Sequence, residues 1–209
     1  MGDFRQKHLD EVKERFAGHI SKYPDFAVKQ LHRDNDVVKL WRCGRPGSSN
    51  CEFYVCSSIG CLMVYGDMGE YMWQRHRDMI PFIRGSIGSL NYFSEKVPSG
   101  IEIKTGHPEL VDEWFEDVKA DRIEYGDDWG DNEDEALEEL KEFWEYNGNV
   151  DAFLWQYADS VLNTDCEDFP KVEFYTFHYL WIIEGLKWFI QQLDGGNVLP
   201  YQEPAVSGK

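Results

Sequence analysis

The stretch from Val172 to Leu193 (VEFYTFHYLWIIEGLKWFIQQL) constrains the fold of this chain more than any other segment. Its apolar residues would cover every side of an α-helix, which is typical of a helix buried in a large core or in a membrane. A membrane span needs about 20 residues with few or no charges, whereas Glu184 and Lys187 lie mid-segment at a spacing that lets them pair. We therefore predict a buried core helix, with Pro170 as a start signal and Gly195–Gly196 as a stop signal. Gly185 costs up to about 1 kcal/mol relative to Ala inside a helix, so we expect another element to pass close to it.

Upstream of this helix, the sequence predicts one helix followed by a run of strands. An amphipathic pattern predicts a helix over Asp3–Tyr23, and a short helical turn is expected over Phe26–Leu31. Strands separated by turn residues are then predicted at Val37–Cys43, Cys51–Ser57, Cys61–Gly66 and Glu70–Arg75. Because the connections are short, the strands should form an antiparallel meander over residues 37–75, with one face against the central helix.

Helical signals return after the strands, at Arg77–Gly85, Ser89–Val97, His107–Asp121, Asp131–Tyr146 and Asn149–Leu162. Strands followed by a run of helices indicate an α+β fold. We expect an antiparallel four-stranded meander packed against a helical bundle with a buried C-terminal helix. The length of 209 residues suits one domain, over residues 1–199, followed by a flexible tail at 200–209.

The net charge of −18 is concentrated in one segment. Residues 107–168 contain 22 acidic residues against Lys119, Arg122 and Lys141, a net charge of −19, so the rest of the chain sums to +1. The carboxylates alternate with core residues at helical spacing, which predicts folded helices with charged outer faces. Such asymmetry indicates a cationic partner, although an acidic face can also serve solubility alone.

The cysteines and histidines do not form a recognisable metal site. Cys43, Cys51, Cys56 and Cys61 lack the Cys-x2-Cys spacing of structural zinc sites. We expect them to be reduced thiols, with Cys43 facing Cys51 and Cys56 facing Cys61 across neighbouring strands. The run from Asp127 to Asp134 departs from the calcium-loop pattern at the positions that need an oxygen ligand and a glycine. We predict no metal and no cofactor.

The chain carries no motif that defines an enzyme. No nucleophile elbow, zinc-protease or P-loop pattern is present, and His178 is expected to be a hydrogen-bonded core histidine. Met1–Lys22 lacks the apolar region of a signal peptide, and the odd number of cysteines is typical of a reducing cytosol. We expect a cytoplasmic, non-enzymatic protein that neither spans a membrane nor binds nucleic acid directly.

Several short stretches resemble a group of small bacteriophage and prophage proteins of uncharacterised activity. These stretches are Tyr65–Tyr71, which contains a Gly-Asp-Met-Gly turn, Met79–Phe82, Tyr92–Lys96 and the aromatic-rich C-terminal helix ending in Gly185-Leu186-Lys187. The resemblance covers residues 37–97 and 174–193 and leaves the acidic segment unmatched. It implies a phage accessory protein that acts in the cytoplasm of the host bacterium, and it assigns no catalytic residue.

Together, the charge distribution and the resemblance predict an inhibitor of a host defence or nucleic-acid-handling complex, in the manner of an anti-CRISPR protein. Duplex DNA carries one negative charge per about 1.7 Å, and two acidic helices could offer a similar density to a basic groove. The expected partner-binding residues are the carboxylates Asp127, Asp128, Asp131, Asp134, Glu135, Glu138, Glu139 and Glu142. The alternatives are an enzyme or small-ligand binder with a pocket between sheet and central helix, using His178, Glu184 or Asp67, and a scaffold protein that docks through exposed aromatics. The oligomeric state is left open.

Overall fold

The fold of this protein is α+β. The computed structural model describes residues 3–31, 38–75, 78–125, 131–160 and 170–201, with side chains for all of these except 3, 119, 121–125, 131–137 and 158–160. Seven helices are formed by these residues: α1 (Asp3–Lys22), α2 (Met79–Ser86), α3 (Leu90–Ser94), α4 (Pro108–Tyr125), α5 (Asp131–Asn147), α6 (Val150–Ser160) and α7 (Phe177–Asp194). The strands are β1 (Ala27–Gln30), β2 (Val38–Gly44), β3 (Phe53–Ser58), β4 (Cys61–Gly66), β5 (Gly69–Gln74), β6 (Lys104–Gly106), β7 (Glu173–Tyr175) and β8 (Val198–Leu199).

The main sheet contains the predicted meander and extends beyond it. Its strand order is β5-β4-β3-β2-β1-β8, and every pairing is antiparallel except that of β1 with β8. Strands β2 to β5 follow one another as predicted. The prediction of four strands was wrong, because the described part of the chain places six in this sheet. A second, two-stranded sheet pairs β6 with β7.

Strand β1 replaces the helical turn that was expected over Phe26–Leu31. Its four residues pair with β2 on one side and with β8, from the far end of the chain, on the other. Val28 in its centre is fully buried. Pairing with a strand on each side outweighs the local preference of so short a segment.

The central helix α7 is buried as predicted, but it begins later than expected. Residues Glu173–Tyr175 form β7, and the helix starts at Phe177, where the Thr176 side chain accepts a hydrogen bond from the Tyr179 N–H at 3.2 Å. The side chains predicted to lie in the core are almost wholly buried: Trp181, Ile182, Leu186 and Phe189.

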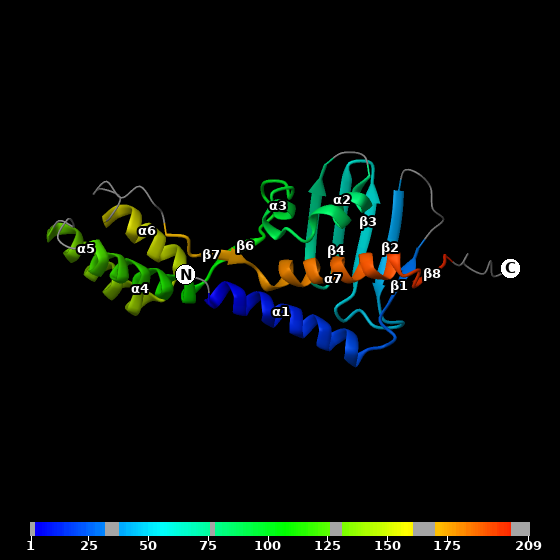
Figure 1. The fold of residues 1–209 in the computed structure, drawn as a ribbon, viewed down its shortest axis with the longest axis horizontal. Helices are drawn as coiled ribbons and strands as arrows, with labels where there is room; N and C mark the ends of the chain where they lie inside the picture. Colours follow the sequence, from blue (N-terminus) through cyan, green and yellow to red (C-terminus); the bar gives the residue numbers. More distant parts are fainter. Residues whose placement is uncertain (1–2, 32–37, 76–77, 126–130, 161–169, 202–209) are drawn as a thin grey trace, which may run out of the picture. The chain divides into compact units, whose positions relative to one another are not determined.

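Helix α7 lies against one face of the main sheet, with α1 beside it (Figure 1). The Phe189 ring packs on Trp41 of β2 at a centroid distance of 5.2 Å. A Cβ placed on Gly185 would lie 3.0 Å from the Phe53 ring of β3, so the expected close approach at this glycine is confirmed. From α1, the Phe16 ring packs edge-on against Trp181 at 5.1 Å. The predicted pair forms at the solvent side of the helix, where Lys187 Nζ is 2.5 Å from Glu184 Oε1.

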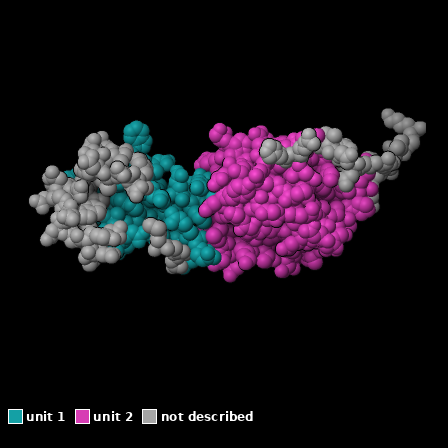
Figure 2. All heavy atoms as spheres, turned by 45° about the horizontal axis from the view of Figure 1, so that its top comes forward, with its two compact units in different colours: residues 1–7, 104–175 teal, residues 8–103, 176–209 magenta. Residues whose placement is uncertain are grey.

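The chain divides into two compact units, coloured separately in Figure 2. Unit 1 contains residues 1–7 and 104–175, and unit 2 contains residues 8–103 and 176–209. Each unit has its own apolar core. Unit 1 contains the whole of the acidic segment 107–168. A single domain over residues 1–199 stays a prediction.

The expected cysteine pairs are wrong by two residues. Cys43 faces Phe53, and Cys51 lies before β3 with a φ of 56°. Cys56 faces Met63, whereas Cys61 faces Ser58. The connection between β2 and β3 is therefore longer than its apolar pattern suggests, because Cys51 and Glu52 belong to the loop. All four thiols are free.

No helix in the described ranges is both long enough and apolar enough to cross a membrane.

Candidate functional site: an acidic surface on unit 1

Unit 1 exposes a set of carboxylates on α4 and α5, which we call the acidic surface. Its described members are the exposed residues Glu109, Asp112, Glu116, Glu138, Glu139, Glu142 and Glu145. The two helices alternate these residues with core side chains. The acidic segment therefore folds as helices in its described part, as the helical spacing predicted.

Helix α5 shows how the sequence separates charge from core. Leu140 is fully buried and Trp144 is 7% exposed, whereas Glu138 and Glu142, which lie four residues apart, are both exposed. Residues four apart are neighbours on a helix surface, and like charges at this spacing destabilise the helix slightly. Helix stability therefore does not explain the acidity of this face.

The buried sides of α4, α5 and α6 meet in an aromatic and aliphatic core. Its members are Leu110, Val111, Leu140, Trp144, Val150, Phe153, Tyr157 and Val172. Phe153 contacts the rings of Trp114, Phe115 and Trp144 at centroid distances between 5.6 and 5.8 Å. This packing gives the carboxylates a folded support.

Two carboxylates of α4 also hold unit 1 together. Asp112 Oδ1 accepts a hydrogen bond from Trp144 Nε1 at 2.9 Å and so connects α4 to α5. Glu113 Oε1 accepts one from the Phe4 backbone N–H at 3.0 Å. These two residues have a structural role, in contrast to the exposed glutamates of α5.

The predicted partner-binding residues fall into three groups. Glu138, Glu139 and Glu142 lie together on α5 and are exposed. Asp131, Asp134 and Glu135 lie in the first turns of the same helix, but their side chains are outside the described set. Asp127 and Asp128 lie outside the described residues altogether.

Two exposed aromatic residues of unit 1 were missed by the sequence analysis. Tyr146 near the end of α5 is 89% exposed, and Trp155 on α6 is 81% exposed. Trp155 lies two residues from both Phe153 and Tyr157, which are buried, so helical periodicity places it on the opposite face. This two-residue offset from the buried aromatics was the feature of the sequence that could have identified Trp155 as exposed. Large exposed aromatics are unusual on a soluble surface and frequent at binding sites.

The residues proposed for a pocket between sheet and central helix do not form a site. His178 is exposed in the first turn of α7, so the expectation of a buried histidine was wrong. Glu184 pairs with Lys187, and Asp67 is exposed beyond the end of β4. All three residues are described, and no hydrogen bond or ion pair joins any two of them.

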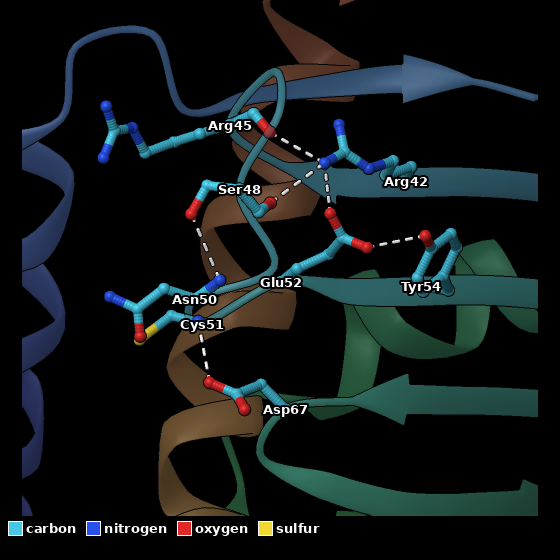
Figure 3. A network of polar contacts seen from close by, with 8 residues as sticks. All are labelled: Arg42, Arg45, Ser48, Asn50, Cys51, Glu52, Tyr54 and Asp67. Carbon is cyan, nitrogen blue, oxygen red and sulfur yellow. Dashed lines mark hydrogen bonds and ion pairs between the residues drawn. The ribbon is translucent and has the colours of Figure 1, made fainter.

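In unit 2, a polar network ties the loop after β2 to the start of β3 (Figure 3). The Arg42 guanidinium pairs with the Glu52 carboxylate and donates to the Arg45 carbonyl at 2.7 Å and the Ser48 carbonyl at 3.2 Å. Tyr54 Oη donates to the other Glu52 oxygen at 2.6 Å, and this bond raises the pKa of Tyr54. The partners of these groups all lie in β2, in the loop after it or at the start of β3, so the network holds this loop in place.

The Gly-Asp-Met-Gly turn fastens the same loop from the other side. Asp67 Oδ2 accepts a hydrogen bond from the Cys51 N–H at 2.9 Å (Figure 3), and the Asp67 N–H donates to the Glu52 carbonyl at 2.9 Å. A Cβ on Gly66 would lie 2.2 Å from the Glu52 carbonyl oxygen, so only glycine fits. This part of the motif therefore has a structural explanation. Asp67 holds the neighbouring loop.

The thiols of unit 2 are unsuited to nucleophilic or metal chemistry. Burial raises the pKa of Cys43 well above its ordinary value, and burial also raises the pKa of Cys51, Cys56 and Cys61. The thiolate is the nucleophile and the metal ligand, so these groups stay protonated near neutral pH. Among the described residues, no group of three or more His, Cys, Asp or Glu side chains could hold a metal ion.

The fold and the surface define this chain as an α+β protein that combines a six-stranded sheet with an acidic helical unit. Comparison with protein-family models, with curated proteins and with solved structures gives no match.

Proposed function

We propose that this protein is a non-enzymatic bacteriophage accessory protein that binds a basic surface of a host defence or nucleic-acid-handling complex. It acts in the host cytoplasm and keeps nucleic acid from that complex, as an anti-CRISPR protein does. The observation that carries the proposal is the row of exposed carboxylates on a folded helix. The phage origin is supported by the resemblance of residues 37–97 and 174–193 to small phage proteins.

The spacing of charge on α5 is similar to that of a nucleic-acid strand. Glu138, Glu139, Glu142 and Glu145 are all exposed within eight consecutive residues. At 1.5 Å per residue these span about 12 Å. The exposed Lys141 lies among them, so the net charge is −3, or one negative charge per roughly 4 Å. One strand of DNA carries a charge every ~3.4 Å. A groove lined with Lys and Arg for a phosphate backbone would thus meet a comparable density of negative charge.

The exposed aromatics give the same unit a means of tight binding. Charged rims mainly raise the association rate and select the partner, whereas Trp and Tyr often carry most of the binding energy. Trp155 and Tyr146 also offer ring faces on which Arg or Lys side chains can stack. A basic partner that uses both features would be held more strongly than by charge alone.

The proposal is tested by reversing the charge of α5. Glu135, Glu138, Glu139 and Glu142 are changed together to Lys, which shifts the net charge by +8 and leaves the buried Leu140 and Trp144 untouched. Four charge pairs at about 0.5–1 kcal/mol each correspond to a loss of affinity of roughly 30- to 1000-fold. The measurement is displacement of DNA from purified bacterial CRISPR effector complexes, at low and at high salt.

A matched control places the same charge change on unit 2. Glu11, Glu14, Glu95 and Glu102 are exposed there, and their fourfold change to Lys also shifts the net charge by +8. The control should inhibit as well as the unaltered protein does. Equal inhibition by the α5 variant, or loss of inhibition in both variants, would contradict a site on the acidic surface. If the unaltered protein displaces DNA from none of the complexes, the anti-CRISPR form of the proposal fails.

A further inference from the structure

The main sheet has a second face on which the described side chains of β1 to β5 are all at least partly exposed. On the face toward α7, the alternating residues of β3 and β4 are fully buried, among them Phe53, Val55, Leu62 and Val64. The residues between them, on the opposite face, are all partly or largely exposed. We call the latter side, over β1 to β5, the open face.

The strand pairings place the residues of the open face in rows. One row is apolar and runs across four strands: Leu40 faces Cys56, Cys56 faces Met63, and Met63 faces Met72. Every member is at least partly exposed, and Met63 reaches 45%. A row of apolar side chains across a sheet is the pattern of a face that packs against a second sheet.

The next row along the strands is charged at both ends, with opposite signs. Lys29 faces Arg42, Arg42 faces Tyr54, Tyr54 faces Tyr65, and Tyr65 faces Glu70. The two central tyrosines stack at a centroid distance of 5.1 Å with an interplanar angle of 7°. The Arg42 charge is already paired with Glu52, so Lys29 and Glu70 are the outer charges of this row.

We propose that the open face binds the open face of a second copy of this chain. A twofold axis parallel to the strands and passing over β3 would bring Lys29 of one copy opposite Glu70 of the other. The same rotation sets Leu40 opposite Met63 and Cys56 opposite its own equivalent. The face is thus complementary to itself in charge and in apolar character, which is the requirement for an isologous dimer.

The area of the open face indicates how strongly the two copies should bind each other. Five strands at ~4.8 Å and six residues at ~3.4 Å give a projected area of roughly 500 Å² per copy. Stable interfaces bury about 800 Å² per partner. The dimer should therefore be weak and form only at high protein concentration, and it is independent of the proposed function of unit 1.

Sedimentation equilibrium on the full chain between about 1 and 500 μM tests this inference. The unaltered protein should dimerise, and Met63→Lys should remain monomeric with an unchanged circular dichroism spectrum. The control is Ile59→Lys, because Ile59 is 63% exposed on the turn between β3 and β4 and lies outside both rows. This variant should dimerise normally. A monomer at every concentration, or a dimer that survives Met63→Lys, overturns the proposal.

A charge exchange tests the orientation of the two copies. Glu70→Lys alone sets two lysines opposite each other and should weaken the dimer by about tenfold. Adding Lys29→Glu restores opposite charges and should recover the affinity. Because neither residue changes the apolar row, recovery in the double variant supports the twofold arrangement. Failure to recover, with both variants folded, rules out this pairing of Lys29 with Glu70.

Discussion

At the scale of single residues, the bond between Asp112 and Trp144 gives the clearest test of unit 1. Trp144 is 7% exposed and donates its Nε1–H to Asp112 at 2.9 Å. Asp112→Ala leaves this donor without its acceptor, which costs about 1–3 kcal/mol. Asp112→Asn keeps an oxygen acceptor and should lose less. Urea unfolding measures both, and the exposed Glu142→Ala provides a control expected to change stability by no more than about 0.5 kcal/mol.

His19 should make the protein sensitive to mild acid. Its Nε2 is buried without a hydrogen bond, and its ring contacts Phe26 and Trp181. Burial, followed by the charges of Arg45 and Lys22, lowers the pKa of His19 below its ordinary value of 6.5. The unfolded chain therefore binds a proton more readily, and stability falls as the pH drops below about 6.5.

The variant His19→Phe removes this titration while keeping an aromatic ring in place. Its free energy of unfolding should fall less steeply between pH 6.5 and pH 5 than that of the unaltered protein. Chemical unfolding at a series of pH values measures the two slopes. Equal slopes would show that other groups cause the acid sensitivity.

Residue-level features were only partly predictable from the sequence. The pairing of Glu184 with Lys187 follows from their spacing on one helix, and the structure confirms it. The partner of Asp112 lies 32 residues away and depends on how two helices pack. His178 was expected in the core because its neighbours are apolar, yet it lies in the first turn of α7 and is exposed there, although it shares a helical stripe with the buried Ile182 and Phe189.

At the scale of elements, the contact between α7 and β3 at Gly185 permits a prediction with a matched control. A Cβ on Gly185 would lie 3.0 and 3.1 Å from two carbons of the fully buried Phe53 ring. Overpacking typically costs 1–3 kcal/mol, and the gain in helix propensity offsets about 1 kcal/mol of this. Gly185→Ala should therefore destabilise the protein by about 1 kcal/mol.

The control is Gly18→Ala on α1, where an added Cβ meets nothing within 4 Å. This change should stabilise the protein by up to about 1 kcal/mol. In a Phe53→Leu background, Gly185→Ala should lose most of its penalty. Melting temperatures report all of these variants. A stabilising Gly185→Ala in the unaltered background would mean that Phe53 can yield to the added methyl group.

Most elements could be predicted because their periodicity is strong and local. The meander follows from alternating residues between glycine-containing turns, and α1, α4 and α5 follow from their apolar stripes. Strand β1 could not be recognised, since its four residues owe their conformation to β2 and β8. The start of β3 was misplaced because Cys51 takes a φ of 56°, held by Asp67 from another turn.

At the scale of the whole molecule, the charge distribution was the most informative feature of the sequence. The acidic segment 107–168 lies inside unit 1, which spans residues 104–175 together with the first seven residues. The acidic composition of residues 107–168 thus indicated from the sequence alone that this part of the chain is distinct. The separate core of that part was not predicted, because the apolar stripes of α4, α5 and α6 do not identify the partner against which each packs.

The two cores lead to a prediction about how the molecule loses structure. Leu140 is fully buried in the core of unit 1, and Leu62 is fully buried under the sheet of unit 2. Replacing either with Ala costs about 2–5 kcal/mol. Because the side chains around each leucine belong to its own unit, the loss of protection should begin there.

Hydrogen exchange measured by mass spectrometry distinguishes the two variants. Leu140→Ala should speed exchange in α4, α5 and α6 and leave the amides of β2 to β5 close to their original rates. Leu62→Ala should do the reverse. Uniformly faster exchange throughout the chain in both variants would show that the units unfold as one cooperative body. In that case the acidic helices would depend on the sheet for their stability, and charge reversal on α5 would have to be checked for effects on the whole fold before any loss of binding is assigned to the acidic surface.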